Sequence, residues 1–187
     1  MKFEINDQSI ETSFDILAKE LLTNHILDVN GQTFEFTEIE FYYYKKGVHE
    51  DISVHPHKRD AGEWRAHRSG LDITFAGNDT QDGGILIRGI KCGNNYINGP
   101  LRVLRFIFQN MGSVNTIGSI QLKKKVSSNK TLPIFKTTRH GLGKSVEKNF
   151  KLKLYRYFVD LDNWNNKHVS KKDKHQILQA SKKLTSP

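Results

Sequence analysis

The sequence predicts an α+β fold: a single mixed domain with a curved, mostly antiparallel β-sheet flanked by helices. Strand-like runs and helical periodicities alternate along the chain, and no segment repeats. The length of 187 residues is enough to bury one complete hydrophobic core without disulfides or metal ions as supports. We therefore expect one main domain over residues 1–164, followed by a basic helical appendage over residues 165–187.

The first part of the chain predicts a helix, a turn, a strand and a long loop. Apolar residues recur at helical spacing from Phe14 to Leu22. A turn at Asn30–Gly31 precedes a run of β-branched and aromatic residues over 34–44, which is typical of a strand. Residues 45–69 are polar and rich in histidine, and they predict a long loop with short local structure.

The second part predicts four more strands and two helices. The strands are expected at residues 71–75, 85–88, 120–126 and 150–159. A helix is expected over residues 101–109, because Pro100 suits the first turn of a helix. Residues 170–184 predict a basic, weakly amphipathic helix without a proper core face, and for this reason we expect it to be an appendage.

The charge of the chain favours polyanionic partners. Lys and Arg number 29 against 20 Asp and Glu, which gives a net charge of +9 and a pI near 9.6. Nucleic acid is the first partner that such an excess suggests, and solubility alone is the competing explanation. The single cysteine, Cys92, fits a reducing compartment. With no signal peptide and no apolar run long enough for a membrane, we expect a cytoplasmic protein that does not bind membranes.

The run over residues 34–44 is the most informative segment, because it carries carboxylates among aromatic rings. Side chains alternate between the faces of a strand. One face is therefore expected to hold Phe34, Phe36, Glu38, Glu40, Tyr42 and Tyr44. A carboxylate among rings is poorly solvated, which favours work as a general acid or base. The alternative is a glutamate at the sheet rim that forms an ion pair with one of the many cations.

The segment Glu38–Tyr42 resembles the Glu-x-Glu-Ala-Tyr segment of the alkyladenine (3-methyladenine) DNA glycosylases, and it follows a similar Leu-Ala-x-x-Leu-Leu helix. Later segments resemble later blocks of this family in the same order, over about residues 14–164. These segments are Leu71–Thr74, Gly84–Arg88, Asn98–Pro100, Thr138–Gly143 and Lys153–Phe158. The resemblance implies the fold of that family, and it says less about activity because sites are grafted onto folds.

The activity that the resemblance implies is hydrolysis of the N-glycosidic bond of a damaged purine, alkylated or deaminated, flipped out of double-stranded DNA. Glu40 would activate a water against the sugar carbon and offset the positive charge that develops there. Arg88 matches the arginine of the family that orients this water. A family histidine is expected at His55, with His49 and His57 as alternatives. The reaction needs no cofactor and no metal.

The resemblance also assigns residues that bind the base. Tyr42 would stack on the flipped base, and Asp72 stands where the family has an asparagine that discriminates among purines. Asp at this position is an acceptor only, unless it is protonated. The family's Tyr-Gly-x-Tyr wedge is missing, and Trp64 or His67 could substitute for it.

Basic side chains are expected to contact the DNA backbone. They are Arg139, Lys144, Lys123 and Lys124. We expect the protein to act on double-stranded DNA as a monomer.

Two other functions stay open from the sequence. A catalytically silent protein of the same fold would use the pocket to bind nucleic acid or a nucleobase. A metal-dependent hydrolase would need histidines such as His55 and His57 to meet a carboxylate, although no tight motif for ligands occurs.

Overall fold

The computed structural model describes residues 1–126 and 132–184. Strand β2 (Gln32–Lys45) is a central strand of its sheet. It pairs with β6 (Gln81–Cys92) along most of one edge, and with β1, β10 and β3 along its other edge. The strand order is β11-β9-β10-β2-β6-β5-β4, with β8 added beyond β1 and β7 beside β6. Every pairing in the described residues is antiparallel.

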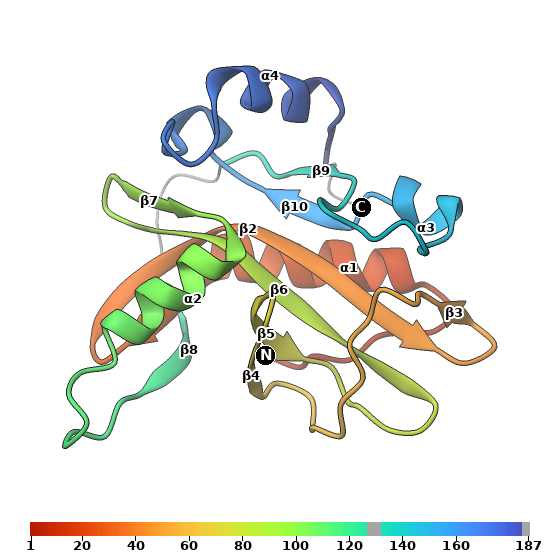
Figure 1. The fold of residues 1–187 in the computed structure, drawn as a ribbon, viewed down its shortest axis with the longest axis horizontal. Helices are drawn as coiled ribbons and strands as arrows, with labels where there is room; N and C mark the ends of the chain where they lie inside the picture. Colours follow the sequence, from red (N-terminus) through yellow and green to blue (C-terminus); the bar gives the residue numbers. More distant parts are fainter. Residues whose placement is uncertain (127–131, 185–187) are drawn as a thin grey trace.

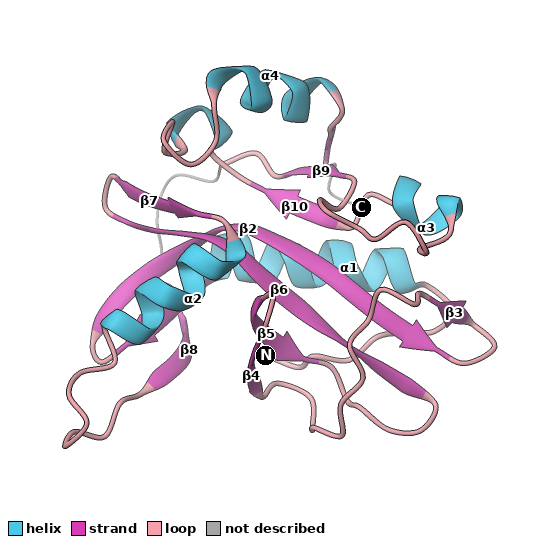
Figure 2. Ribbon diagram, viewed as in Figure 1, coloured by secondary structure: helices cyan, strands magenta, loops and turns pink. Residues whose placement is uncertain are grey.

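The other elements are shorter. The remaining strands are β1 (His25–Val29), β3 (His49–Glu50), β4 (Trp64–His67), β5 (Gly70–Thr74), β7 (Asn95–Asn98), β8 (Ile120–Lys124), β9 (Phe135–Thr137), β10 (Arg156–Phe158) and β11 (Lys182–Lys183). The helices are α1 (Ile10–Lys19) with the π-helical turn Glu20–Asn24, α2 (Pro100–Gln109), α3 (Lys148–Leu152), the 3-10 turn Leu161–Asn163 and α4 (Lys171–Gln179). Figure 2 shows the sheet crossing the centre of the molecule between these helices.

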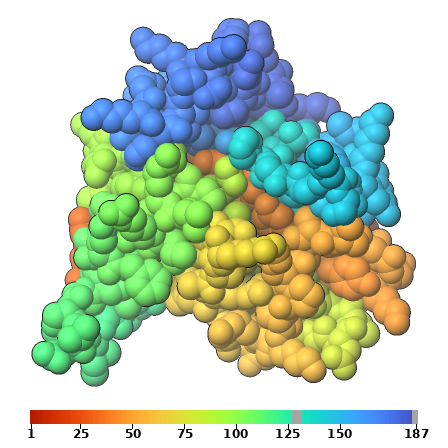
Figure 3. Space-filling view, in the orientation of Figure 1, coloured from red at the N-terminus to blue at the C-terminus, as the bar shows by residue number. Residues whose placement is uncertain are grey.

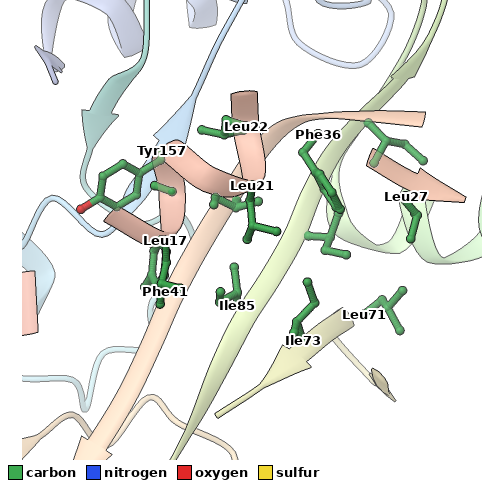
Figure 4. Packing of buried hydrophobic residues seen from close by; sticks show 14 of the residues in the cluster. Leu17, Leu21, Leu22, Leu27, Phe36, Phe41, Leu71, Ile73, Ile85 and Tyr157 are labelled. Carbon is green, nitrogen blue, oxygen red and sulfur yellow. The ribbon is translucent and has the colours of Figure 1, made fainter. Parts of the chain in front are cut away.

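Helix α1 covers one face of the sheet. Figure 1 shows α1 behind β2 and β6, α2 in front at their other end, and α4 beyond β9 and β10. Side chains of α1 and its π-helical turn pack on β2, β5 and β6 around Leu17, Phe41 and Ile85 (Figure 4). The Phe14 and Phe41 rings are stacked with centroids 4.5 Å apart. Burial of this apolar stripe is what holds the helix on the sheet.

The predicted fold class is confirmed: the chain forms one α+β domain with a large, open, antiparallel sheet and a few helices. The predicted apolar stripe from Phe14 to Leu22 is buried, and Pro100 occupies the first turn of α2. Residues 45–69 hold only the short strands β3 and β4.

Two predicted elements differ from the structure. The strand expected over 150–159 is wrong in its first half, where α3 ends at Leu152 and only Arg156–Phe158 join the sheet. The C-terminal segment is tied to the sheet, because β11 pairs with β9 and the ammonium of Lys174 donates to the carbonyl oxygens of Asp162 and Trp164. Residues 185–187 of the expected appendage lie outside the described residues.

The predicted faces of β2 are wrong at one point, and a β-bulge is the reason. The register of β2 against β6 shifts around Glu38, opposite Gly89. A bulge inserts one residue, so the alternation of side chains reverses beyond it. Phe34 and Phe36 therefore lie on the core face together with Phe41 and its neighbours, and not with Glu40 and Tyr42.

The bulge depends on a glycine. A Cβ at Gly89 would lie 2.6 Å from Thr37 Oγ1 and 3.0 Å from Glu38 Cβ. We expect Gly89→Ala to lower the free energy of unfolding by about 1–3 kcal/mol, because buried neighbours must shift. Gly143→Ala is the matched control, since its nearest atom would be 3.7 Å away. Urea titration measures both, and equal stability of the two variants would contradict the role of Gly89.

Candidate functional site

The register of the sheet places several of the predicted site residues on one face. Asp72 lies opposite Leu86, Leu86 opposite Glu40, and Glu40 opposite Arg156. Directly opposed residues of neighbouring strands point to the same side of a sheet. Since the flanking side chains of β2 belong to the core under α1, this row faces away from α1. Figure 3 shows the yellow segment of β4 and β5, the green segment of α2 and the orange segment after β2 meeting on that side.

Glu40 is the most enclosed residue of the row, with 0% of its surface exposed. The Tyr42 hydroxyl donates a hydrogen bond to Glu40 Oε2 at 2.8 Å, and Arg88 Nη1 donates to the same oxygen at 3.3 Å. The backbone N–H of His140 donates to Oε1 at 2.8 Å. Both carboxylate oxygens are therefore engaged, and a water reaches Glu40 only after one of these contacts opens.

Glu38 lies between two guanidinium groups. Arg88 Nε and Arg156 Nε donate to Glu38 Oε1 at 2.8 and 2.7 Å. Burial alone would raise the pKa of Glu38, but Arg156 and Arg88 hold it below its usual value. Burial likewise acts to lower the pKa of Arg88, while Glu38 and Glu40 raise it above its usual value. Glu38 is thus a fixed anion that positions Arg88 against Glu40.

Arg139 belongs to the loop that contacts Glu40 through the His140 N–H, and its side chain is fully buried. Its Nη1 is 2.6 Å from Asp51 Oδ2 and donates to the carbonyl oxygen of Phe41 and to Ser53 Oγ. The expected contact of Arg139 with a DNA phosphate does not fit this position, because an ion pair inside the protein takes its place. The buried side chain of Arg139 instead anchors the backbone just before the His140 N–H that donates to Glu40.

Tyr42 is the partly exposed member of the site. The guanidinium carbon of Arg139 lies 4.7 Å from the centroid of its ring, which is a cation–π contact. Burial and the Glu40 carboxylate raise the pKa of Tyr42, so its hydroxyl stays protonated at neutral pH. The ring is therefore held by a cation at its face and by Glu40 at its hydroxyl.

Six buried charges make up what we call the buried charge network. Its members are Glu38, Glu40, Asp51, Arg88, Arg139 and Arg156. Three anions balance three cations, so each charge keeps a partner in a medium that screens poorly.

A second cluster of polar side chains lies on the same face of the sheet, at β4 and β5. His67 Nε2 is 2.9 Å from Asp72 Oδ2, and the His67 ring lies 5.6 Å from that of His55. Burial, followed by the neighbouring His67, Arg68 and Arg65, lowers the pKa of His55. Asp72 Oδ1 is buried without a hydrogen-bond partner among the described residues. No ion pair or hydrogen bond of the described residues joins His55 to Glu40 or Arg88, so the structure brings Glu40 and Arg88 together but does not join His55 to them.

Trp64 does not belong to this face. It lies opposite Ile73, a core residue, so its ring is on the other side of the sheet from Asp72. Trp64 Nε1 donates to the carbonyl oxygen of Ile120 at 3.1 Å, and the ring lines a hollow of about 360 Å³ with Phe3 and Leu122. The expected part of Trp64 in binding the base does not fit this position, whereas His67 lies on the site face.

The lysines that we expect to contact DNA differ in whether they already form an ion pair within the protein. Lys123 Nζ is 3.0 Å from Asp28 Oδ2, and this partner lowers the pKa of Asp28. Lys124 and Lys144 are exposed, and neither forms an ion pair within the described residues. Of the basic residues that we expect to contact the DNA backbone, Lys124 and Lys144 are therefore the two that are left to pair with a phosphate.

We predicted no role in this site for Arg156 or the His140 N–H, and Asp51 was considered only as a carboxylate near the histidines of the metal-site alternative. Arg156 sits among apolar residues of a strand, which was a usable signal, because an unpaired cation there is costly. The β-bulge breaks the alternation of side chains at Glu38, so the strand pattern alone did not predict where Glu38 points. The positions of Asp51 and His140 depend on contacts with residues far away in the sequence, which no local pattern shows.

The metal-site alternative has no ligand set in the part of the chain that is described: in residues 1–126 and 132–184, no group of three or more His, Cys, Asp or Glu is arranged so that it could hold a metal ion. His57 makes other contacts: its backbone N–H donates a hydrogen bond to Asp82 Oδ1, and its Nε2 lies within hydrogen-bond distance of the carbonyl oxygen of Gly83. In the same ranges, no helix is both long enough and apolar enough to cross a membrane.

Comparisons with known proteins do not identify a family. No protein-family model matches the sequence, and no curated protein matches it significantly.

Proposed function

We propose that this protein binds double-stranded DNA and holds an extruded, damaged purine against Tyr42, where Glu40 and Arg88 hydrolyse its N-glycosidic bond. The fold of the alkyladenine DNA glycosylases, which the sequence resembles, is part of this proposal. The observation that carries it is the partly exposed Tyr42, whose hydroxyl contacts a buried carboxylate and whose ring has Arg139 at its face. A flipped base needs an aromatic surface to stack on and a general base nearby.

The reaction would begin when Tyr42 releases Glu40 Oε2. A water then takes the place of the hydroxyl, and its oxygen bonds to the sugar carbon while the bond from that carbon to the base breaks. The proton of the water passes to Glu40, and the bond electrons leave with the base. An alkylated purine carries a positive charge that its departure neutralises, so this substrate needs no proton donor. The His140 N–H holds Glu40 Oε1 in place throughout, and Arg88 stays beside Oε2.

A second candidate function is binding of a nucleobase without turnover. The specific observation in its favour is that both oxygens of Glu40 are already engaged and the side chain is fully buried. In this case the buried charge network only stabilises the sheet, and Tyr42 only stacks.

A base-release assay separates the two candidates. Duplexes that contain 3-methyladenine, 7-methylguanine, hypoxanthine or no lesion are incubated with the protein, and released base is measured by mass spectrometry. We expect release from a damaged duplex and none from the unmodified duplex, with equal rates in the presence of a chelator. Binding of the damaged duplex with no release of any base would leave the second candidate.

The affinity for duplex DNA is expected to fall steeply with salt, because neutralised phosphates release counterions. We expect Lys124→Gln and Lys144→Gln each to reduce the slope of log affinity against log salt by about 1. Lys125→Gln is the matched control, since Lys125 already pairs with Glu35. Fluorescence anisotropy at several salt concentrations measures the slopes. Absence of binding at low salt would remove the DNA partner from the proposal.

A further inference from the structure

The loop between α2 and β8, residues 110–119, exposes two aliphatic side chains completely. Val114 and Ile117 are each 100% exposed, and Phe108 in the last turn of α2 is 61% exposed. We call residues 110–119 the tip loop; it forms the outermost corner of the molecule below α2 in Figure 1. Single exposed apolar residues are ordinary, but two β-branched residues at the end of a projecting loop contribute nothing to the fold.

The base of the tip loop is firmly held. Asn30, in the turn between β1 and β2, donates from Nδ2 to the carbonyl oxygen of Asn110 at 2.8 Å. It accepts at Oδ1 from the backbone N–H of Ser119 at 2.8 Å, and its own N–H donates to the carbonyl oxygen of Ser119. A hydrogen bond from Thr116 N to the carbonyl oxygen of Ser113 closes the turn at the end. The two aliphatic side chains are thus presented on an anchored support.

The surroundings of the tip loop favour a polyanion. Arg102 and Arg105 are exposed on α2, and Lys124 is exposed on β8. The sequence contains no Asp or Glu between Asp82 and Glu147, a stretch that includes all of α2, the tip loop and β8. Apolar side chains that project from a basic surface are the means by which proteins enter a DNA groove and part a base step. An anionic membrane would need a larger apolar face than two side chains provide.

The position of the tip loop relative to the candidate site fits one continuous duplex. The N–H of Gly99, just before α2, donates to the carbonyl oxygen of Arg88 at 2.7 Å. Helix α2 has 10 residues and so spans about 15 Å. The tip loop begins beyond its far end, and at about 3.4 Å per base pair this separation corresponds to at least four base pairs.

We propose that the tip loop inserts Val114 and Ile117 into a groove of duplex DNA at least about four base pairs from the nucleotide held at Tyr42. This inference rests on the proposed function, because it places a second contact on the same duplex. Arg102 and Arg105 then contact phosphates between the two points.

The test compares Val114→Ser/Ile117→Ser with a control pair, Ile16→Ser/Leu152→Ser, whose residues are more than half exposed on α1 and α3. Fluorescence anisotropy measures affinity for a 30-base-pair duplex across salt concentrations. We expect the tip-loop variant to bind about tenfold more weakly, with an unchanged salt slope, because apolar contacts release no counterions. The control pair should bind like wild type, and thermal unfolding should be unchanged in the tip-loop variant.

Each other outcome overturns a specific claim. Wild-type affinity in the tip-loop variant would overturn the insertion while the proposed function stands. Loss of binding to vesicles of phosphatidylserine and phosphatidylcholine, with DNA affinity intact, would overturn it in favour of a membrane contact. Failure of the wild-type protein to bind the duplex at low salt would overturn the proposed function itself, and the insertion with it.

Discussion

Glu40→Gln is expected to slow base release by about 10²- to 10⁴-fold, which is the usual contribution of a general base. Glutamine keeps the shape of the side chain but cannot accept the proton of the water. It also turns an amide N–H₂ toward one of the present donors, at a cost of about 1–3 kcal/mol in stability. Circular dichroism and duplex binding therefore accompany the release assay, and both should show a folded, DNA-binding protein.

Glu35→Gln is the matched control for this prediction, because it makes the same change on the same strand at a half-exposed position that pairs with Lys125 and Lys91. It should release base at the wild-type rate. Tyr42→Phe removes only the hydroxyl that occupies Glu40 Oε2, so release should continue while the ring still stacks. A Glu40→Gln variant that releases base as fast as wild type would refute the mechanism.

Patterns local to the sequence predicted the α+β fold class and the buried stripe of α1 and its π-helical turn. The helical spacing from Phe14 to Leu22 and the aromatic run over 34–44 each depend on near neighbours, and each was confirmed as an element. Strands β1 and β7 are short, and neither was predicted. The segment from 150 to 159 shows the limit of local patterns: its apolar residues suit a helical turn and a strand equally well.

The site could be predicted only for the part of β2 in which side chains alternate between the two faces without interruption. Glu40 and Tyr42 do lie on one face, since both follow the bulge. Phe34 and Phe36 do not share that face, because a register shift opposite Gly89 leaves no pattern in the sequence of β2 itself. Arg139 could not be placed either, since its partner Asp51 comes from a distant loop of irregular structure.

Glu38→Gln is expected to lower the free energy of unfolding by about 3–5 kcal/mol, the typical cost of removing one partner from a buried ion pair. Glu38 Oε1 accepts from both Arg88 and Arg156, so a neutral amide leaves two buried cations short of one anion. For a chain of this size the midpoint of thermal unfolding should fall by about 2–4 °C per kcal/mol. Replacing both partners, as in Glu38→Leu/Arg156→Leu, should recover part of the loss, because no unpaired charge stays buried.

The dependence on pH distinguishes a lost charge from lost packing. Arg156 and Arg88 outweigh the effect of burial and hold the pKa of Glu38 below 4.5, the value that an unperturbed glutamate has in the unfolded chain. A group whose folded pKa is depressed stabilises the fold above its unfolded pKa, and this contribution is lost as the pH falls through the folded pKa. The difference in unfolding free energy between wild type and Glu38→Gln should therefore be complete at pH 7 and shrink progressively below about pH 4.5. Urea titrations from pH 7 to pH 3 measure this difference. A constant difference over that range would mean that Glu38 stabilises the sheet by its shape and not by its charge.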